Sequence, residues 1–193
     1  MNTPLFQGEL VRLKARDPET FAAAISRWNR DSEYQRLLDS ETSRVVSKKI
    51  MKEWIEKDLE NRPEHDYLFL IHTLQEDRLI GFIGLDGISW SHGDCWVFIA
   101  LGERDTWGKG YGTDAMRIML RYAFTELNLH RVSLDVFSYN PHAIRSYEKC
   151  GFVVEGRARG MLNREGRRDD FVYMGILKEE WERTASAGGS KDE

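Results

Sequence analysis

Three glycines at alternate positions constrain this chain more than any other feature of its sequence. Gly108, Gly110 and Gly112 lie between a β-rich run and a strongly amphipathic helical pattern. Glycines keep side chains away, so backbone N–H groups can converge on an anion at the N-terminus of a helix, where the helix dipole adds attraction. Residues 104–115 therefore predict a phosphate-binding loop, to which Lys109 adds a positive charge.

The loop on its own is compatible with other sites. Residues 110–115 fit the dinucleotide fingerprint G-x-G-x-x-A, and Asp135 follows 23 residues after Gly112. Three observations count against a dinucleotide site: residues 102–107 separate the strand from the glycines, Asp135 lies inside an apolar run, and the preceding chain is typical of antiparallel hairpins. A Walker A loop is excluded because no Gly-Lys-Ser/Thr occurs. A glycine-rich loop without a ligand is a further alternative.

Composition limits the architecture and the partners. With 193 residues, of which 41% are apolar and 31% charged, the chain predicts one compact domain over residues 1–183 and a mobile polar tail over residues 184–193. The net charge of -4 argues against a general nucleic-acid or membrane surface. The basic residues between Arg164 and Arg168 are more typical of a solvated turn.

Metal binding, secretion and membrane insertion are not expected. The two cysteines, Cys95 and Cys150, form no CxxC motif, and the five histidines show no metal-ligand spacing. The sequence has no signal-peptide pattern and no apolar run that approaches the roughly 18 to 20 residues of a membrane span. We therefore expect a cytoplasmic protein with reduced thiols.

Strand-like and helix-like patterns alternate along the chain. Strands are predicted near residues 9–14, 67–72, 79–85, 95–101, 131–137, 152–156 and 171–177. Helices are predicted over residues 18–28, 47–59, 115–127 and 141–150, with Asp17 and Ser47 as N-caps. Residues 32–44 are polar and stay unassigned.

A second motif makes the prediction more specific. Asn140, Tyr147 and the pair Gly151-Phe152 follow the glycine loop by about 30 to 40 residues. Together the two motifs resemble the GNAT superfamily of acetyl-CoA-dependent N-acetyltransferases, and residues 127–156 resemble its RimJ/RimL and spermidine acetyltransferase branch. The resemblance extends from about Gly8 to Trp181. It implies an α+β, three-layer fold with a mainly antiparallel, twisted sheet of about six or seven strands, flanked by helices and splayed at its central parallel pair.

The resemblance also implies how acetyl-CoA is held. The glycine loop would bind the pyrophosphate, while main-chain groups at the end of the preceding strand would bind the pantetheine arm and polarise the thioester carbonyl. The expected cofactor-binding residues are Ile99, Ala100, Leu101, Trp107, Gly108, Lys109, Gly110, Tyr111, Gly112, Thr113 and Asn140. Trp107 stands where the superfamily pattern Q/R-x-x-G-x-G/A has Gln or Arg, so we expect it either to pack beneath the loop or to lie over the cofactor.

Tyr147 is the expected catalytic residue. By the resemblance it lies on a helix beside the thioester, where a phenol with a reference pKa of about 10 can protonate a departing thiolate of pKa about 8.5. A plain packing role for its ring is the alternative. No catalytic base is evident, because the candidate carboxylates Glu33, Asp86, Asp94 and Asp135 show no distinctive spacing.

The absence of an evident catalytic base bears on which amine the protein can acetylate. At pH 7 an α-amino group is roughly one-tenth neutral, whereas a lysine-like amine is neutral in about one molecule in 2,500. We therefore expect a protein N-terminal amine as the acceptor, with a polyamine or aminoglycoside-type small molecule as one alternative and a non-catalytic acyl-CoA-binding module as another. The N-terminal helices would cover the acceptor, and the aromatic residues that could line such a cleft are Trp28, Tyr34, Trp54 and Trp90. A homodimer is a further expectation, which no pattern fixes.

Overall fold

The computed structural model describes residues 4–61 and 67–188 of the chain. Its strands form a seven-stranded mixed sheet in the order β1-β2-β3-β4-β5-β7-β6. The strands are β1 (Val11–Ala15), β2 (Leu68–Thr73), β3 (Leu79–Ser89), β4 (Asp94–Leu101), β5 (Arg131–Phe137), β6 (Val153–Arg164) and β7 (Arg167–Leu177). Strands β4 and β5 are parallel, whereas β1, β2 and β3, and likewise β5, β7 and β6, pair antiparallel. The predicted mixed α+β fold is thereby confirmed.

Six α-helices accompany the strands in the described ranges. They are α1 (Pro18–Trp28), α2 (Ser32–Leu38), α3 (Lys48–Asn61), α4 (Tyr111–Arg121), α5 (Pro141–Glu148) and α6 (Lys178–Gly188). Helix α4 continues into a π-helical turn at residues 122–126. Helix α6 extends into the segment that the sequence assigned to a polar tail, and residues 189–193 lie outside the described residues.

The chain divides into two compact units. The first unit contains residues 1–84 and 99–115, and the second contains residues 85–98 and 116–193. Strands β3 and β4 and helix α4 each begin in one unit and end in the other. The glycine loop therefore belongs to the first unit, and Tyr147 belongs to the second.

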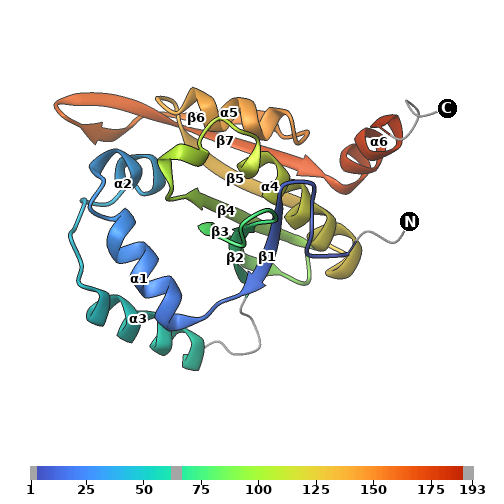
Figure 1. The fold of residues 1–193 in the computed structure, drawn as a ribbon. Helices are drawn as coiled ribbons and strands as arrows, with labels where there is room; N and C mark the ends of the chain where they lie inside the picture. Colours follow the sequence, from blue (N-terminus) through green and yellow to red (C-terminus); the bar gives the residue numbers. More distant parts are fainter. Residues whose placement is uncertain (1–3, 62–66, 189–193) are drawn as a thin grey trace. The chain divides into compact units, whose positions relative to one another are not determined.

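In the first unit, the helices begin where the sequence places polar caps. The Asp17 carboxylate accepts the Thr20 N–H at 2.8 Å and so starts α1. Asp31 caps α2 in the same way, through the N–H of Glu33 at 3.0 Å. Figure 1 shows α1 and α3 side by side. Helix α2 lies in the segment left unassigned by sequence, because its seven residues are too few for a clear helical period.

In the second unit, β6 and β7 form a longer hairpin than the sequence predicts. The expected strands covered only residues 152–156 and 171–177, but β6 continues to Arg164 and β7 begins at Arg167. In the outer half of β6 only Leu162 is buried, so the sequence there offers few large apolar side chains to mark a strand. Glu165 and Gly166, with φ of 52° and 75°, make the turn.

The described residues contain neither a membrane-spanning helix nor a metal-binding cluster. No helix within residues 4–61 and 67–188 is both long and apolar enough to cross a membrane. No group of three or more His, Cys, Asp or Glu side chains in those ranges is arranged to hold a metal ion.

Candidate active site

The glycine loop ends where α4 begins, at Tyr111. Gly108 and Gly110 have φ of +72° and +89°, a backbone conformation that residues with side chains rarely adopt. A Cβ atom added at Gly108 would meet nothing within 4 Å, so the space beside that backbone is open. The first-turn N–H groups of an α-helix have no partner within the helix. This geometry leaves room for a phosphate group, and phosphate binding by the loop stays a prediction.

A buried carboxylate fixes the first turn of α4. Asp114 is only 6% exposed, and its two oxygens accept the N–H groups of Glu9, Leu10 and Val11 at 3.1, 2.8 and 3.0 Å. A Cβ atom at Gly8 would overlap the Asp114 carboxylate. The chain entering β1 is thus bound to the helix that carries the predicted anion site.

Trp107 connects the loop to the end of β4. Its indole N–H donates to the Leu101 carbonyl at 2.8 Å, and the ring is half-buried. The guanidinium of Arg104 lies 5.1 Å from the ring centroid. Ile99 and Leu101 place side-chain methyl groups beneath Gly112. Trp107 therefore anchors the loop to the strand end, and the coenzyme contacts expected of Trp107 and of residues 99–101 stay predictions.

Glu103, just before the loop, is held by residues from α1 and β2–β3. Its carboxylate accepts the Trp28 indole N–H at 2.8 Å and an Arg78 N–H at 3.2 Å, and it pairs with Arg27. Burial opposes ionisation, but the Trp28 and Arg27 hydrogen bonds and the charges of Arg27 and Arg78 outweigh it and lower the pKa of Glu103. Glu103 is therefore an anion with its hydrogen-bonding capacity in use, which does not suit a proton acceptor for the substrate amine.

In the second unit, α5 presents Asn140 and Tyr147. The Asn140 side-chain oxygen caps α5 by accepting the Ala143 N–H at 3.2 Å. Tyr147 is half-buried, and its ring meets Phe152 edge-on with centroids 6.1 Å apart. Desolvation raises the pKa of Tyr147 above its usual value, and the nearby Asp135 raises it further. The phenol is thus protonated at neutral pH.

The structure distinguishes Asp135 among the four candidate carboxylates. The Asp135 side chain is exposed, yet partial desolvation raises its pKa, and its charge acts on Tyr147. Glu33 forms an ion pair with Arg104 at 2.6 Å, and Asp86 is exposed, with Oδ1 accepting the N–H of Gly87 at 2.8 Å. Sequence spacing did not single out Asp135, because its relation to α5 depends on the fold.

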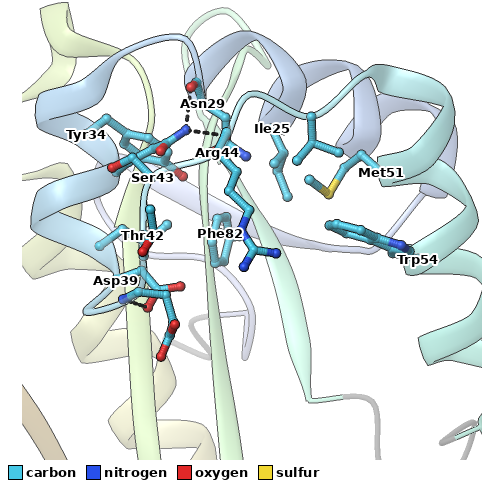
Figure 2. Close-up of a pocket in the computed structure, with 14 residues that line it drawn as sticks. Ile25, Asn29, Tyr34, Asp39, Thr42, Ser43, Arg44, Met51, Trp54 and Phe82 are labelled. Carbon is cyan, nitrogen blue, oxygen red and sulfur yellow. Dashed lines mark hydrogen bonds between the residues drawn. The ribbon is translucent and has the colours of Figure 1, made fainter.

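A cavity of about 500 Å³ opens in the first unit among α1, α2, α3 and β3 (Figure 2). Its apolar lining consists of Ile25, Leu38, Val46, Met51, Trp54 and Phe82. Its polar lining comes mainly from α2 and residues 39–44, the segment that the sequence left unassigned. Of the four aromatic residues expected around an acceptor cleft, Tyr34 and Trp54 line this cavity. Trp28 instead is buried against Glu103, and Trp90 is exposed beyond β3.

Comparisons with known proteins agree with this geometry. The family model described as Acetyltransferase (GNAT) domain matches residues 9–153. A relative described as an SPbeta prophage-derived uncharacterized N-acetyltransferase, YokL of Bacillus subtilis, is 30% identical over 182 residues, which are 94% of this chain and 98% of that protein. The spermidine N(1)-acetyltransferase of Vibrio cholerae is 33% identical over 146 residues, covering 70% of this chain and 84% of the relative.

A solved structure extends the similarity to three dimensions. The crystal structure of spermidine N-acetyltransferase from Vibrio cholerae in complex with CoA and spermine matches with a TM-score of 0.75 and 26% identity. The match covers 89% of this chain and 97% of that one.

Proposed function

Because this chain belongs to the GNAT acetyltransferase family and is an N-acetyltransferase, we propose that it moves the acetyl group of acetyl-CoA to a primary amine, with Tyr147 as general acid. The observation that carries the proposal is the glycine loop at the N-terminus of α4, whose positive φ angles and open space suit a pyrophosphate. Its backbone N–H groups and Lys109 would bind the two phosphates.

Acetyl-CoA supplies a thioester, whose carbonyl carbon is open to attack by an amine. In this proposal the strand end at Ile99–Leu101 orients the pantetheine arm, and Trp107 keeps the loop fixed to that strand end. Tyr147 donates its phenolic proton to sulfur as the carbon–sulfur bond breaks. The proton that the amine loses on forming the amide restores the phenol, so the reaction releases the acetylated amine and free CoA thiol.

Two acceptor classes have support. A polyamine is favoured by the similarity to proteins named spermidine N-acetyltransferase, which is stronger support than the sequence alone gave to a protein N-terminal amine. The N-terminal amine is favoured by Glu103, Asp105 and Glu33, which are all engaged in ion pairs, because an α-amine needs less help to lose its proton.

An acceptor panel tests the transfer. The wild-type protein is mixed with acetyl-CoA and, separately, spermidine, an aminoglycoside, a dipeptide and an amino-acid amide. We expect free thiol to appear with at least one of them, and mass spectrometry to find that amine heavier by one acetyl group. Binding of CoA without thiol release for every amine in the panel would contradict the proposal.

The cofactor site has its own test, in which Gly110→Val is compared with Gly166→Val by calorimetric CoA titration. Both glycines have positive φ, so both variants carry similar backbone strain, but only Gly110 lies in the loop. We expect Gly110→Val to lose CoA binding and Gly166→Val to keep it. Equal CoA affinities in the two variants would remove the pyrophosphate from this loop.

A further inference from the structure

One face of the sheet in the second unit gathers aromatic side chains from three strands. Strand β5 pairs antiparallel with β7, which places Asp135 opposite Tyr173. Two residues further along, Phe137 lies opposite Phe171. Directly paired residues, and residues two apart in one strand, point to the same face of a sheet. The Tyr173 ring also meets the Trp96 ring of β4, so Trp96 lies on this face too. We call Trp96, Phe137, Phe171 and Tyr173 the aromatic face.

The rings of the aromatic face form two edge-on pairs. The centroids of Trp96 and Tyr173 are 6.4 Å apart, with ring planes at 78°. The centroids of Phe137 and Phe171 are 5.2 Å apart, with ring planes at 88°. Trp96 is 42% exposed, whereas Phe137 is buried. Trp96 therefore leaves aromatic surface in contact with solvent, where the ring of a ligand can pack.

A carboxylate on this face has no counter-ion. Asp135 is exposed, and within residues 4–61 and 67–188 it forms no hydrogen bond or ion pair with another residue. Asp94, at the start of β4, lies beside Arg131 of β5. The other charged residues of this face form two ion pairs, which are Arg131–Glu155 and Arg167–Asp169. Asp135 is therefore the carboxylate to which a positively charged ligand can bind without displacing an arginine.

The aromatic face lies next to the group that we assign as the acid. Pairing of β4 with β5 ends at Trp96 and Ser133, so Asp135 lies two residues beyond the point where these strands stop pairing. The negative charge of Asp135 acts on the Tyr147 phenol. An amine that hydrogen-bonds to Asp135 therefore lies within electrostatic range of Tyr147.

We infer that the acceptor is a primary amine that carries an aromatic ring, with its nitrogen on Asp135 and its ring against Trp96 and Tyr173. The Asp135 carboxylate accepts N–H groups from the ammonium and from the neutral amine alike. Partial desolvation raises the pKa of Asp135, and a bound ammonium would lower it again, so the two charges stabilise each other. The inference rests on the proposed acetyl transfer and names its acceptor class.

Other amines use only part of this surface. Spermidine carries several ammonium groups at neutral pH, of which one can pair with Asp135, and it has no ring. A cyclohexyl amine has the bulk of a phenyl ring but no π-system, so it cannot make the edge-on contact. A comparison of these amines with phenethylamine therefore separates the charge, the bulk and the π-system of the acceptor.

The acceptor class is tested by thiol release from acetyl-CoA with phenethylamine, 2-cyclohexylethylamine and spermidine. The assay is run at pH 9, where about one alkyl amine molecule in 25 is neutral. We expect kcat/KM for phenethylamine to exceed the value for each of the other two amines about 3- to 10-fold, because only phenethylamine makes the third aromatic contact.

The ring contact is tested with Trp96→Leu, for which Trp90→Leu is the matched control. Both tryptophans are exposed in the second unit, but Trp90 lies in the turn between β3 and β4. We expect Trp96→Leu to raise the KM for phenethylamine about 3- to 10-fold and to leave kcat unchanged. Trp90→Leu should keep the wild-type KM. Calorimetric CoA affinity, unchanged in both variants, shows that each is folded.

The carboxylate is tested with Asp135→Asn, for which Glu126→Gln is the matched control. Glu126 is an exposed carboxylate in the π-helical turn after α4, outside the sheet. We expect Asp135→Asn to lower kcat/KM for phenethylamine about 10- to 100-fold with CoA affinity unchanged, because the amine loses a charged hydrogen-bond partner. Glu126→Gln should match the wild type.

The outcomes separate this inference from the proposed function. Thiol release with none of the amines would count against the transfer itself. Turnover that favours spermidine, or equal kcat/KM for phenethylamine and 2-cyclohexylethylamine, would leave the transfer standing and overturn the aromatic acceptor. Equal KM values in Trp96→Leu and Trp90→Leu, or equal kcat/KM in Asp135→Asn and Glu126→Gln, would also overturn it.

Discussion

At the scale of single residues, Tyr147 combines a raised pKa with a position on a short, well-capped helix. Removing only its hydroxyl, as in Tyr147→Phe, keeps the edge-on contact with Phe152. We expect turnover to fall about 10- to 1,000-fold, which is the range of general acid catalysis, and CoA affinity to stay within a factor of about two. Steady-state thiol release and calorimetry measure the two quantities.

A second tyrosine serves as the control for that substitution. Tyr122→Phe removes a hydroxyl from another half-buried tyrosine, outside α5, and should leave turnover close to wild type. Equal turnover in Tyr147→Phe and the wild type would remove Tyr147 from the chemistry and leave its ring as a packing element.

The sequence predicted which residues of the candidate site are unusual, but it did not predict their hydrogen-bond partners. Trp107 was recognised as unusual at the loop entrance, but its hydrogen bond to Leu101 depends on how far the intervening 3₁₀ turn at Arg104–Thr106 bends the chain. Asn140 was recognised from the motif, and the structure shows that its side-chain oxygen caps α5. The type of a residue and its local motif can be read from the sequence. Its hydrogen-bond partner several residues away depends on the backbone path, which no single residue determines.

At the scale of elements, the N-terminus of α4 depends on the carboxylate of Asp114. In Asp114→Asn, one acceptor oxygen becomes an NH₂ donor that faces backbone N–H groups of residues 9–11. We expect a loss of about 2–4 kcal/mol in the free energy of unfolding, measured with urea, because buried donors lose their partner. CoA binding should weaken as well, since the first turn of α4 loses its anchor.

The glycine that faces this carboxylate gives an independent check. Gly8→Ala keeps the charge but places a methyl group against the Asp114 oxygens, so it should also be destabilising. Gly156→Ala, where an added Cβ meets nothing within 4 Å, is the control. Wild-type stability in both Gly8→Ala and Asp114→Asn would show that the hydrogen bonds between residues 9–11 and Asp114 do not stabilise α4.

Elements were predictable where buried residues run along their whole length. Helix α1 matches its predicted range because apolar residues recur at helical spacing along it, and β5 matches because it is a short, almost continuously buried run. Helix α2 and the outer halves of β6 and β7 were missed, because few buried residues mark a period there. The polar wall of the cavity comes from α2 and the segment after it, so this cavity was the part of the first unit that the sequence predicted least well.

At the scale of the whole molecule, the pH dependence of turnover combines the acceptor amine with Tyr147. Attack requires a neutral amine, so kcat/KM rises with pH up to the pKa of the acceptor. That rise should level off near pH 8 for an α-amine and continue toward about pH 10 for an alkyl amine. Tyr147 must be protonated to act as the acid. Because desolvation and Asp135 raise the pKa of Tyr147, the enzyme should lose activity only at a pH above the ordinary tyrosine range.

The resulting profile for leucine amide is a plateau from about pH 8 to 9.5, since the amine is already neutral and the phenol still carries its proton. Initial rates of thiol release across pH 6 to 10, corrected for spontaneous hydrolysis of acetyl-CoA, give the profile directly. A fall in kcat with an apparent pKa below about 9 would contradict Tyr147 as the acid, because desolvation and Asp135 move its pKa upward. A profile for leucine amide that still rises at pH 9.5 would show that deprotonation of the α-amine does not limit kcat/KM. Weak basicity would then be no reason to favour an α-amine over an alkyl amine as the acceptor.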